Sequence, residues 1–338
     1  MMGLQRREFL SLVGVGALGT LVLSACGKLG GGTRVKGPTI GLLQMVDAPP
    51  PNNTRKGFEA ALAAAGYIPG KTVNLIQKDA AGELANTTLV MKQFVGDGVD
   101  MILAVGTPPL QAAMKVAPET TPVIFCYCSN PWGAGAGTPP GGVGQHRPNV
   151  VGTIGTNPVG KELDLARQID PKLSRVGLIF NPGEPNSEYE AKVLRAEAAK
   201  RDITVVEQSV ANSGEVLQAA QVLAQKQVDA FVKIGDYATI QGFGSIAKVG
   251  LEKKIPVYSV DADDIKLPGC LATVGWSYFD DGVAAGKLAV RVLKGESPAT
   301  MAFEPLTKTE MLLNRATAAA IGVTLPEELL KQAKEVVG

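Results

Sequence analysis

The chain has 338 residues, more than one hydrophobic core usually organises, so its length favours two lobes over one compact unit. Hydrophobic residues make up 45% and charged residues 19% of the chain, a composition that excludes a disordered protein and a coiled coil. The net charge of +1 excludes the basic surface typical of nucleic-acid binding. One histidine and four cysteines are too few for a histidine-rich metal site or a scaffold with several disulfides, and we expect no metal and no cofactor.

The first 25 residues have the layout of an export signal. Arg6-Arg7 precedes an almost uncharged, apolar run that is shorter than the ~20 residues of a membrane-spanning helix. The run ends at Leu23-Ser24-Ala25-Cys26, which resembles the lipobox of bacterial lipoproteins, in which the cysteine carries the lipid after cleavage. Arg6-Arg7 also resembles the twin-arginine motif, so both the general secretory and the twin-arginine routes stay open. We therefore predict a signal peptide over residues 1–25, a lipid anchor at Cys26 and a flexible tether over residues 26–37.

The rest of the chain contains an internal repeat. Four short motifs of the first half recur in the same order in the second half, at a nearly constant spacing. The pairs are Ile40-Gly41-Leu42-Leu43 with Val176-Gly177-Leu178-Ile179, Gly82-Glu83 with Gly214-Glu215, Val99-Asp100 with Val228-Asp229, and Thr121-Pro122-Val123 with Ile255-Pro256-Val257. The chain therefore consists of two similar halves.

Each half alternates short Val- and Ile-rich strands with helices, which predicts parallel sheets. The apolar spacing predicts helices over residues 55–65, 84–95 and 187–200, the last with Asn186 or Ser187 as its cap. The carboxyl ends of parallel strands meet at one edge of a sheet, where ligands bind. We expect an α/β fold of two Rossmann-like lobes that face each other across a cleft.

The chain is expected to cross between the lobes more than once. We assign residues 38–156 and about 277–300 to the first lobe, and residues 157–275 and about 301–338 to the second. A helix is predicted over residues 280–294, followed by extended segments at 303–306 and 310–314. Several crossings form a hinge, at which a few residues absorb the backbone rotation while the lobes close.

Together, the lipobox, the repeated α/β halves and the crossings resemble a bacterial type I periplasmic solute-binding protein of an ABC importer. The local motifs resemble the subfamily of tryptophan- and tyrosine-binding lipoproteins. These motifs are Ile40-Gly41-Leu42-Leu43-Gln44, Arg55-Lys56-Gly57-Phe58, Thr107-Pro108, Phe180-Asn181, Glu184-Pro185-Asn186-Ser187, Asp236, Ile255-Pro256-Val257, Asp261-Ala262-Asp263 and Leu293-Lys294-Gly295. The resemblance implies a monomer that binds a small molecule between its lobes and a membrane permease that recognises the closed form.

The chain departs from this subfamily at the edge of the cleft. Asn130-Pro131 stands where relatives usually have Asp-Pro, and a long glycine- and proline-rich loop follows over residues 132–148. Tyr237 stands where relatives tend to have asparagine. Because both differences lie at the edge of the predicted cleft, they bear on which ligand the protein binds.

A zwitterionic ligand needs donors for its carboxylate and an acid for its ammonium group. Thr107 and Ser187 lie at the starts of predicted helices, where hydroxyl and N–H groups bind anions. Asp236, Asp261 and Asp263 follow strand ends and would hold the ammonium group or cap turns. Phe180 and Trp276 are the preferred stacking partners among the aromatic residues, which also include Tyr127, Trp132, Tyr237 and Tyr278. The complete predicted ligand set is Gln44, Asp47, Thr107, Asn130, Phe180, Glu184, Asn186, Ser187, Asp236, Asp261, Asp263 and Trp276.

We therefore predict an exported, lipid-anchored receptor that binds an aromatic or branched amino acid for ABC import. A sugar or nucleoside receptor, or a ligand sensor without a transport role, is the alternative. An enzyme is not expected, because His146 is the only histidine and no nucleophile elbow surrounds a serine. We interpret Cys126 and Cys128 as small buried residues. The sequence does not decide whether one of them forms a disulfide with Cys270.

Overall fold

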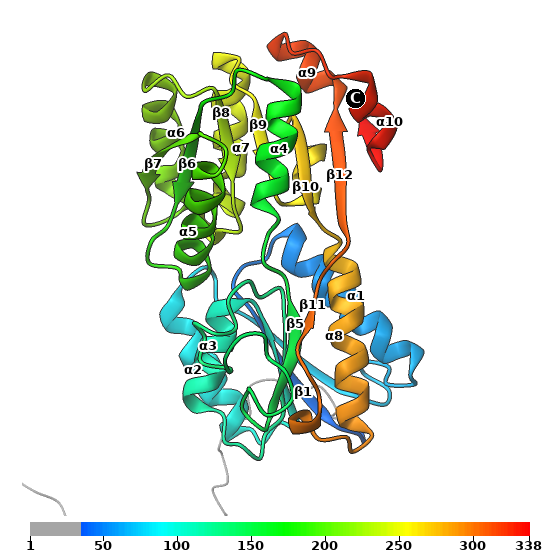
Figure 1. Ribbon diagram of the computed structural model, residues 1–338. Coiled ribbons are helices and arrows are strands. Elements are labelled where there is room, and N and C mark those ends of the chain that lie inside the picture. Colours follow the sequence, from blue (N-terminus) through cyan, green and yellow to red (C-terminus); the bar gives the residue numbers. More distant parts are fainter. Residues whose placement is uncertain (1–34) are drawn as a thin grey trace, which may run out of the picture. The chain divides into compact units, whose positions relative to one another are not determined.

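The computed structural model describes residues 35–338, so the predicted signal peptide and Cys26 lie outside the described residues. This part of the chain contains two α/β lobes, the first in the lower half and the second in the upper half of Figure 1. Within residues 35–338, no helix combines the length and the apolar character that crossing a membrane requires.

The first lobe is built on a six-stranded, fully parallel sheet in the order β11-β5-β4-β3-β1-β2. Its strands are β1 (Thr39–Gln44), β2 (Asn74–Asp79), β3 (Met101–Val105), β4 (Val123–Cys126), β5 (Val150–Ile154) and β11 (Glu304–Pro305). β1 and β3 are buried along their whole length, because central parallel strands are covered on both faces and consist of apolar runs.

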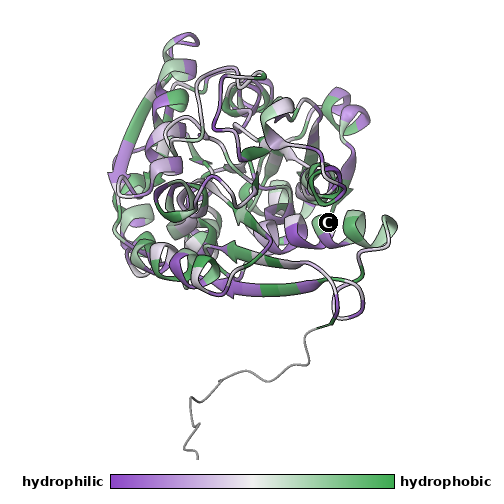
Figure 2. Cartoon of the chain, turned by 90° about the horizontal axis from the view of Figure 1, so that it is seen from below, coloured by the Kyte–Doolittle hydropathy of each residue, from purple (hydrophilic) through white to green (hydrophobic). Residues whose placement is uncertain are grey.

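Four helices cover this sheet. α1 (Pro49–Ala64) and α8 (Tyr278–Leu293) lie on one side, and α2 (Leu84–Gly96) and α3 (Thr107–Val116) lie on the other (Figure 1). The helices carry hydrophobic and hydrophilic residues side by side in Figure 2, as expected of helices with one face on a sheet. One apolar cluster, which includes Phe58, Phe94 and Phe125, fills this lobe.

The second lobe is built on a seven-stranded sheet in the order β13-β12-β10-β9-β8-β6-β7. Its strands are β6 (Arg175–Phe180), β7 (Thr204–Ser209), β8 (Ala230–Lys233), β9 (Val257–Ser259), β10 (Ala272–Trp276), β12 (Thr309–Asn314) and β13 (Glu335–Val337). Its helices are α4 (Val159–Ile169), α5 (Pro185–Ala199), α6 (Val216–Gln225), α7 (Tyr237–Lys253), α9 (Arg315–Ile321) and α10 (Glu327–Gln332). Short 3₁₀ helices occur at Ser213–Glu215, Ala262–Lys266 and Pro298–Thr300.

Two apolar clusters stabilise the second lobe. Leu163 of α4 and Leu194 of α5 belong to one cluster, and Leu223 of α6 and Phe243 of α7 belong to the other. Side chains of β6, β8 and β9 alternate between the two clusters, as a sheet covered on both faces requires.

The predicted repeat is confirmed by the sheet order, because β4-β3-β1-β2 corresponds to β9-β8-β6-β7. The Val-Asp motifs have the same role in both halves. Asp100 Oδ2 accepts a hydrogen bond from the N–H of Thr39 (2.7 Å), and Asp229 Oδ2 accepts one from the N–H of Arg175 (2.8 Å). Each aspartate therefore fixes the start of the neighbouring strand.

Three features of the structure differ from the predictions made from the sequence. β12 runs antiparallel to β10, so the second sheet is mixed. β11 pairs with β5 of the first sheet, although residues 301–338 were assigned to the second lobe. Phe303, just before β11, packs against Phe125 with the ring centroids 4.7 Å apart, which holds this segment in the first lobe. α5 begins at Pro185 with Glu184 as N-cap, so the prediction that Asn186 or Ser187 caps the helix is wrong.

The chain passes between the two sheets three times, after β5, after β10 and between β11 and β12. The first passage leads to α4, and the second leads back to α8. Several such connections side by side form a hinge that constrains how the lobes move.

Candidate functional site

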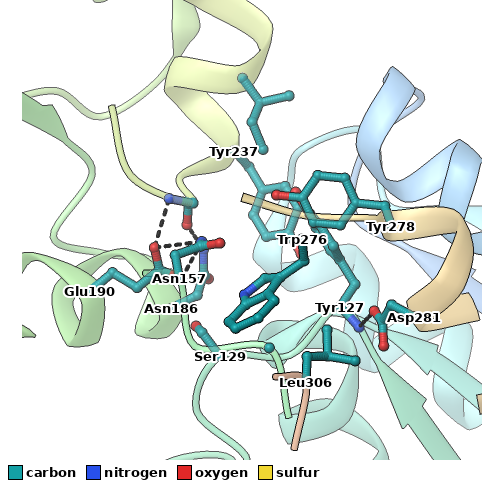
Figure 3. Close-up of a pocket in the computed structure, with 13 residues that line it drawn as sticks. Tyr127, Ser129, Asn157, Asn186, Glu190, Tyr237, Trp276, Tyr278, Asp281 and Leu306 are labelled. Atoms are coloured by element: carbon teal, nitrogen blue, oxygen red, sulfur yellow. Dashed lines mark hydrogen bonds between the residues drawn. The ribbon is translucent and has the colours of Figure 1, made fainter. Parts of the chain in front are cut away.

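A hollow lies between the two lobes, at the carboxyl ends of their parallel strands. It measures about 380 Å³, including the part open to solvent. The first lobe contributes Tyr127, Ser129, Gly155, Tyr278, Asp281 and Leu306, and the second contributes Asn157, Asn186, Glu190, Gly235, Tyr237, Ile240 and Trp276. Both lobes are therefore needed to form the site (Figure 3).

Glu190 is a buried acid on the second-lobe wall of the hollow (Figure 3). Each of its carboxylate oxygens lies 2.9 Å from Asn157 Nδ2, and one also accepts the N–H of Gly235 at 2.8 Å. Burial raises the pKa of Glu190 to about 7, although the hydrogen bonds from Asn157 and Gly235 act in the opposite direction. Among the lining residues there is no lysine, arginine or histidine, so the hollow provides no counter-ion for this carboxylate.

Three polar atoms around the hollow are buried without a hydrogen-bond partner: Ser129 Oγ, Asn157 Oδ1 and Asn186 Oδ1. The orientation of both amides follows from their Nδ2 atoms, since Asn157 donates to Glu190 and Asn186 donates to the carbonyl oxygen of Gly235 (2.8 Å). Buried polar atoms of folded proteins nearly always have a partner. The two amide oxygens, which only accept, therefore indicate a ligand that has hydrogen-bond donors.

Tyr127 adopts a backbone φ of +52°, which is uncommon for a bulky residue and is often found at functional sites. Its N–H donates to Asp281 Oδ2 at 2.8 Å, and the Thr153 hydroxyl donates to the other carboxylate oxygen. Burial raises the pKa of Asp281 to about 6. Asp281 therefore fixes the backbone that carries the Tyr127 ring.

Four aromatic rings, from Tyr127, Tyr237, Trp276 and Tyr278, line the hollow. The Tyr127 and Tyr278 rings meet edge to face at 5.0 Å, and the indole N–H of Trp276 donates to the carbonyl oxygen of Thr156 at 3.2 Å. In Figure 3 the indole extends across the site near Asn157 and Asn186. The arrangement offers flat apolar surfaces close to the polar second-lobe wall.

Residues 39–337 match the family model described as ABC transporter substrate binding protein. The chain belongs to this family. A tyrosine-binding protein of Clostridioides difficile (strain R20291) is 31% identical over 330 residues, which cover 94% of this chain and 93% of that protein.

Two solved structures of similar proteins match the chain to different degrees. An ABC domain from Streptococcus pneumoniae in complex with L-Trp has a TM-score of 0.83 at 28% identity, covering 89% of this chain and 100% of that one. A ligand-free, open substrate-binding protein from Clostridium difficile has a TM-score of only 0.66 at 29% identity, covering 89% and 99%. At nearly equal identity, the chain therefore resembles the structure in complex with L-Trp more closely than the ligand-free, open one.

Two of the twelve predicted ligand residues, Asn186 and Trp276, line the hollow. Three others form a buried network behind its wall. Asp236 accepts hydrogen bonds from the Ser187 hydroxyl (2.6 Å) and from the N–H of Thr239 (2.7 Å), and Glu184 accepts the N–H of Tyr237 (2.9 Å). In this substrate-binding protein these three side chains hold the start of α7.

Asp261 and Asp263 lie beside the hinge. Asp261 forms a buried ion pair with Lys233 and accepts the hydroxyl of Tyr278, whereas Asp263 accepts Asn53 Nδ2 of α1 at 2.6 Å. Burial opposes the charge of Lys233, but Asp261 and Asp264 raise its pKa above its ordinary value. In this arrangement Asp261 already has a cation, so an ammonium ligand is not required for its charge.

The remaining predicted residues lie away from the lining of the hollow. Gln44 Nε2 donates to the carbonyl oxygen of Val46 (3.0 Å), and Asp47 accepts Asn52 Nδ2 (2.6 Å). Thr107 is buried against Cys128 Sγ at 3.4 Å. Asn130 accepts the N–H of Gly133 (2.9 Å), and the Phe180 ring lies 5.5 Å from the Arg195 guanidinium. Direct ligand contact by these residues stays a prediction.

The structure also places the loop over residues 132–148 and the cysteines. Trp132, at the start of the loop over residues 132–148, stacks on Phe303 with the centroids 5.6 Å apart. Cys126, Cys128 and Cys270 are buried and free, so the disulfide that the sequence left open is not present.

Sequence reasoning missed the acids of the site, Glu190 and Asp281. It selected loop residues at strand ends, whereas these acids lie one helical turn further on. Glu190 follows Asn186 by four residues on α5, and Asp281 follows Tyr278 by three residues on α8. Because residues three or four apart share a helix face, that spacing was the signal that identifies them.

Proposed function

We propose that this protein binds an aromatic amino acid between its lobes, outside the cytoplasm, and delivers it to an ABC permease in the membrane. The observation that carries the proposal is Glu190, a buried carboxylate at the hollow without a counter-ion. A buried charge is costly unless it is paired and hydrogen-bonded. A ligand ammonium group supplies both the charge and the donors.

The polar wall suits an α-ammonium group in particular. Such a group has three N–H donors, and Asn157 Oδ1, Asn186 Oδ1 and the Glu190 carboxylate are acceptors on the same wall. A sugar hydroxyl would satisfy the amide oxygens but would leave the Glu190 charge uncompensated. The Ser129 hydroxyl has no partner by hydrogen-bond geometry but lies close enough to Glu190 to lower its pKa, so it is a further polar group for the ligand on this wall.

The aromatic rings suit the side chain of the ligand. Trp276, Tyr127 and Tyr278 present flat surfaces, and offset or edge-to-face contacts with an aromatic ligand add to the burial of apolar area. The names of the relatives agree with this class, since one is a tyrosine-binding protein and another was solved in complex with L-Trp.

Export and anchoring complete the proposal. The Leu23-Ser24-Ala25-Cys26 motif supports a lipid on Cys26 that keeps a monomeric receptor near its permease. Cells that express the protein should incorporate radiolabelled palmitate into it, and the substitution Cys26→Ser should abolish the label. Unchanged labelling of the Cys26→Ser variant would contradict the anchor.

Isothermal titration calorimetry on unfolded and refolded protein tests the ligand class, because refolding removes any ligand carried over from expression. We expect binding of L-Trp, L-Tyr or L-Phe, and a ligand at 100 times its Kd should stabilise the fold by about 2.7 kcal/mol. Binding of sugars or nucleosides alone would contradict the amino-acid proposal while leaving the receptor function intact.

Glu190→Gln is the decisive variant, because it removes the charge and keeps the shape. We expect at least a tenfold loss of affinity for the amino acid, since a charged hydrogen bond of about 1.5–3 kcal/mol is weakened. Glu188→Gln is the matched control on the same helix, where the side chain of Glu188 is 51% exposed and contacts Arg195. Equal affinities of the two variants would contradict the role of Glu190.

A further inference from the structure

Tyr237 belongs to one lobe by sequence and to the other by packing. It is the first residue of α7 in the second lobe. Its side chain nevertheless belongs to the apolar cluster of the first lobe, and only 3% of the residue is exposed. In Figure 3 the ring extends from the α7 side of the site toward the first-lobe residues.

The first lobe has a socket for this ring, formed around Gly106 and Tyr127. Gly106 connects β3 to α3 with a φ of +113°, and a Cβ at this position would overlap the Tyr237 hydroxyl. The Tyr127 and Tyr237 ring centroids lie 6.3 Å apart. The ring therefore fits only because residue 106 has no side chain.

The second lobe holds the other end of Tyr237 rigidly. Its N–H donates to Glu184, and the preceding residue, Asp236, caps α7 while it accepts the Ser187 hydroxyl and the N–H of Asn181 (2.7 Å). Because the backbone of Tyr237 is held by the second lobe and its ring is buried in the first, the two lobes cannot separate unless the ring leaves the first lobe.

Tyr237 also separates two hollows. It lines the ligand hollow and a second, polar hollow of about 650 Å³, including space open to solvent, which is lined by Gly82 and Glu83 of the first lobe and by Glu184 and Gln241 of the second. Withdrawal of the ring would join these two spaces.

We propose that Tyr237 is a closure latch: insertion of its ring into the Gly106 socket stabilises the closed arrangement of the lobes and seals the ligand hollow from the neighbouring one. Opening of the lobes must withdraw the ring from an apolar cluster into water, which is unfavourable. This effect is independent of the identity of the ligand, so it goes beyond the proposed function.

The distance between spin labels on the two lobes tests the latch. Leu89 of α2 is 67% exposed and Leu217 of α6 is 38% exposed, so Leu89→Cys and Leu217→Cys, combined with Cys26→Ser, provide labelling sites in the full chain. The three other cysteines are buried. In ligand-free protein we expect Tyr237→Ala to raise the open-to-closed ratio at least tenfold, whereas Tyr237→Phe keeps the ring and stays within about threefold of the wild type.

A double-mutant cycle with the socket separates a latch from a general loss of structure. Gly106→Ala blocks the socket and should shift the wild-type protein toward the open form. Alanine at this positive φ strains the backbone in both arrangements of the lobes, but in the Tyr237→Ala background there is no ring to block, so Gly106→Ala should have little further effect on the open-to-closed ratio. Tyr258→Phe, a change in a tyrosine buried in the second lobe, is the control that should leave the ratio unchanged.

Equal open-to-closed ratios in the wild type and Tyr237→Ala, including the case in which both are fully open, would overturn the latch. Additive effects of Gly106→Ala and Tyr237→Ala would also overturn it. Neither result depends on which ligand binds, so failure of the latch and failure of the proposed function are distinguishable.

Discussion

At the scale of single residues, Lys233 is the only cation among the buried polar and charged side chains of residues 35–338. Its ammonium group donates to Asp261 and to Asp264 Oδ2 (2.8 Å), and Asp264 also accepts the Ser259 hydroxyl (2.7 Å). Because Asp261 accepts the hydroxyl of Tyr278 from the first lobe as well, one buried lysine organises the acids beside the hinge.

We therefore predict that Lys233→Met destabilises the protein by about 3–5 kcal/mol, because removal of one partner leaves buried charges without compensation. Urea unfolding measures the change. Lys334→Met is the control: Lys334 pairs with Glu310 but is 58% exposed, so its loss should cost less than about 1 kcal/mol. Similar losses in both variants would contradict this account of Lys233.

Residue identities at the site were predictable only in part. Asn186 and Trp276 were predicted because they lie near the carboxyl ends of strands, where parallel sheets bind ligands. Asp236 and Ser187 follow the same rule, but their side chains bond to each other. Which of two adjacent polar residues faces the hollow depends on helix phase and on the tilt of each lobe, and neither is specified by local sequence.

At the scale of elements, α1 and α8 pack backbone to backbone through glycines. A Cβ on Gly282 would overlap the carbonyl oxygen of Thr54, and one on Gly57 would overlap that of Phe279. These helices cover one side of the first sheet (Figure 1), and α8 also provides Tyr278 and Asp281 to the site. Close contact of the two helices therefore positions part of the site.

We predict that Gly282→Val separates α1 from α8 and destabilises the first lobe by at least about 1–3 kcal/mol, the usual cost of overpacking. Hydrogen exchange should accelerate in α1, α8 and the first sheet and stay unchanged in the second lobe. Gly244→Val in α7 is the control, because a Cβ at Gly244 meets no atom within 4 Å. Unchanged exchange in α1 and α8 would contradict the prediction.

Elements were more predictable than site residues, because each half repeats the same physical pattern. Ile40 and Val176 begin equivalent apolar strands, and Asp100 and Asp229 fix the starts of both. The exceptions lie after residue 300, where β11 and β12 are short or partly exposed. Their partners were set by contacts distant in sequence, such as Phe303 with Phe125.

At the scale of the whole molecule, each lobe has its own apolar clusters, and apart from Tyr237, which enters the cluster of the first lobe, the lobes meet at polar and aromatic contacts. Asn53 of the first lobe donates to Asp263 of the second, and Tyr278 donates to Asp261. Among the buried charged side chains of residues 35–338, acids outnumber the one cation, Lys233. Because buried carboxyl groups with a raised pKa, such as Glu190 and Asp281, lie at the hollow between the lobes, the stability of the folded protein should depend on pH.

Five carboxyl groups have a raised pKa, chiefly because of burial: Glu162, Glu184, Glu190, Asp264 and Asp281. Each binds its proton more tightly in the folded than in the unfolded chain, so its contribution to stability is complete below pH ~4 and is lost as the pH rises through its folded pKa. For Glu190, a change from 4.5 to about 7 corresponds to about 3 kcal/mol. Asp164 and Asp229 have lowered pKa values. Their contribution to stability is therefore present at neutral pH and is lost only when the pH falls below ~4.

We therefore predict that the free energy of unfolding of the ligand-free protein is highest near pH 4–5 and falls toward pH 8, with a decrease in Tm of roughly 5 °C or more between pH 5 and 8. Differential scanning calorimetry measures this profile. Glu190→Gln should flatten it, whereas the exposed control Glu188→Gln should not. A bound ammonium ligand favours the charged form of Glu190, so the ligand should raise Tm more at pH 8 than at pH 5. A Tm that increases from pH 5 to 8 without ligand would contradict the assignment of these buried acids.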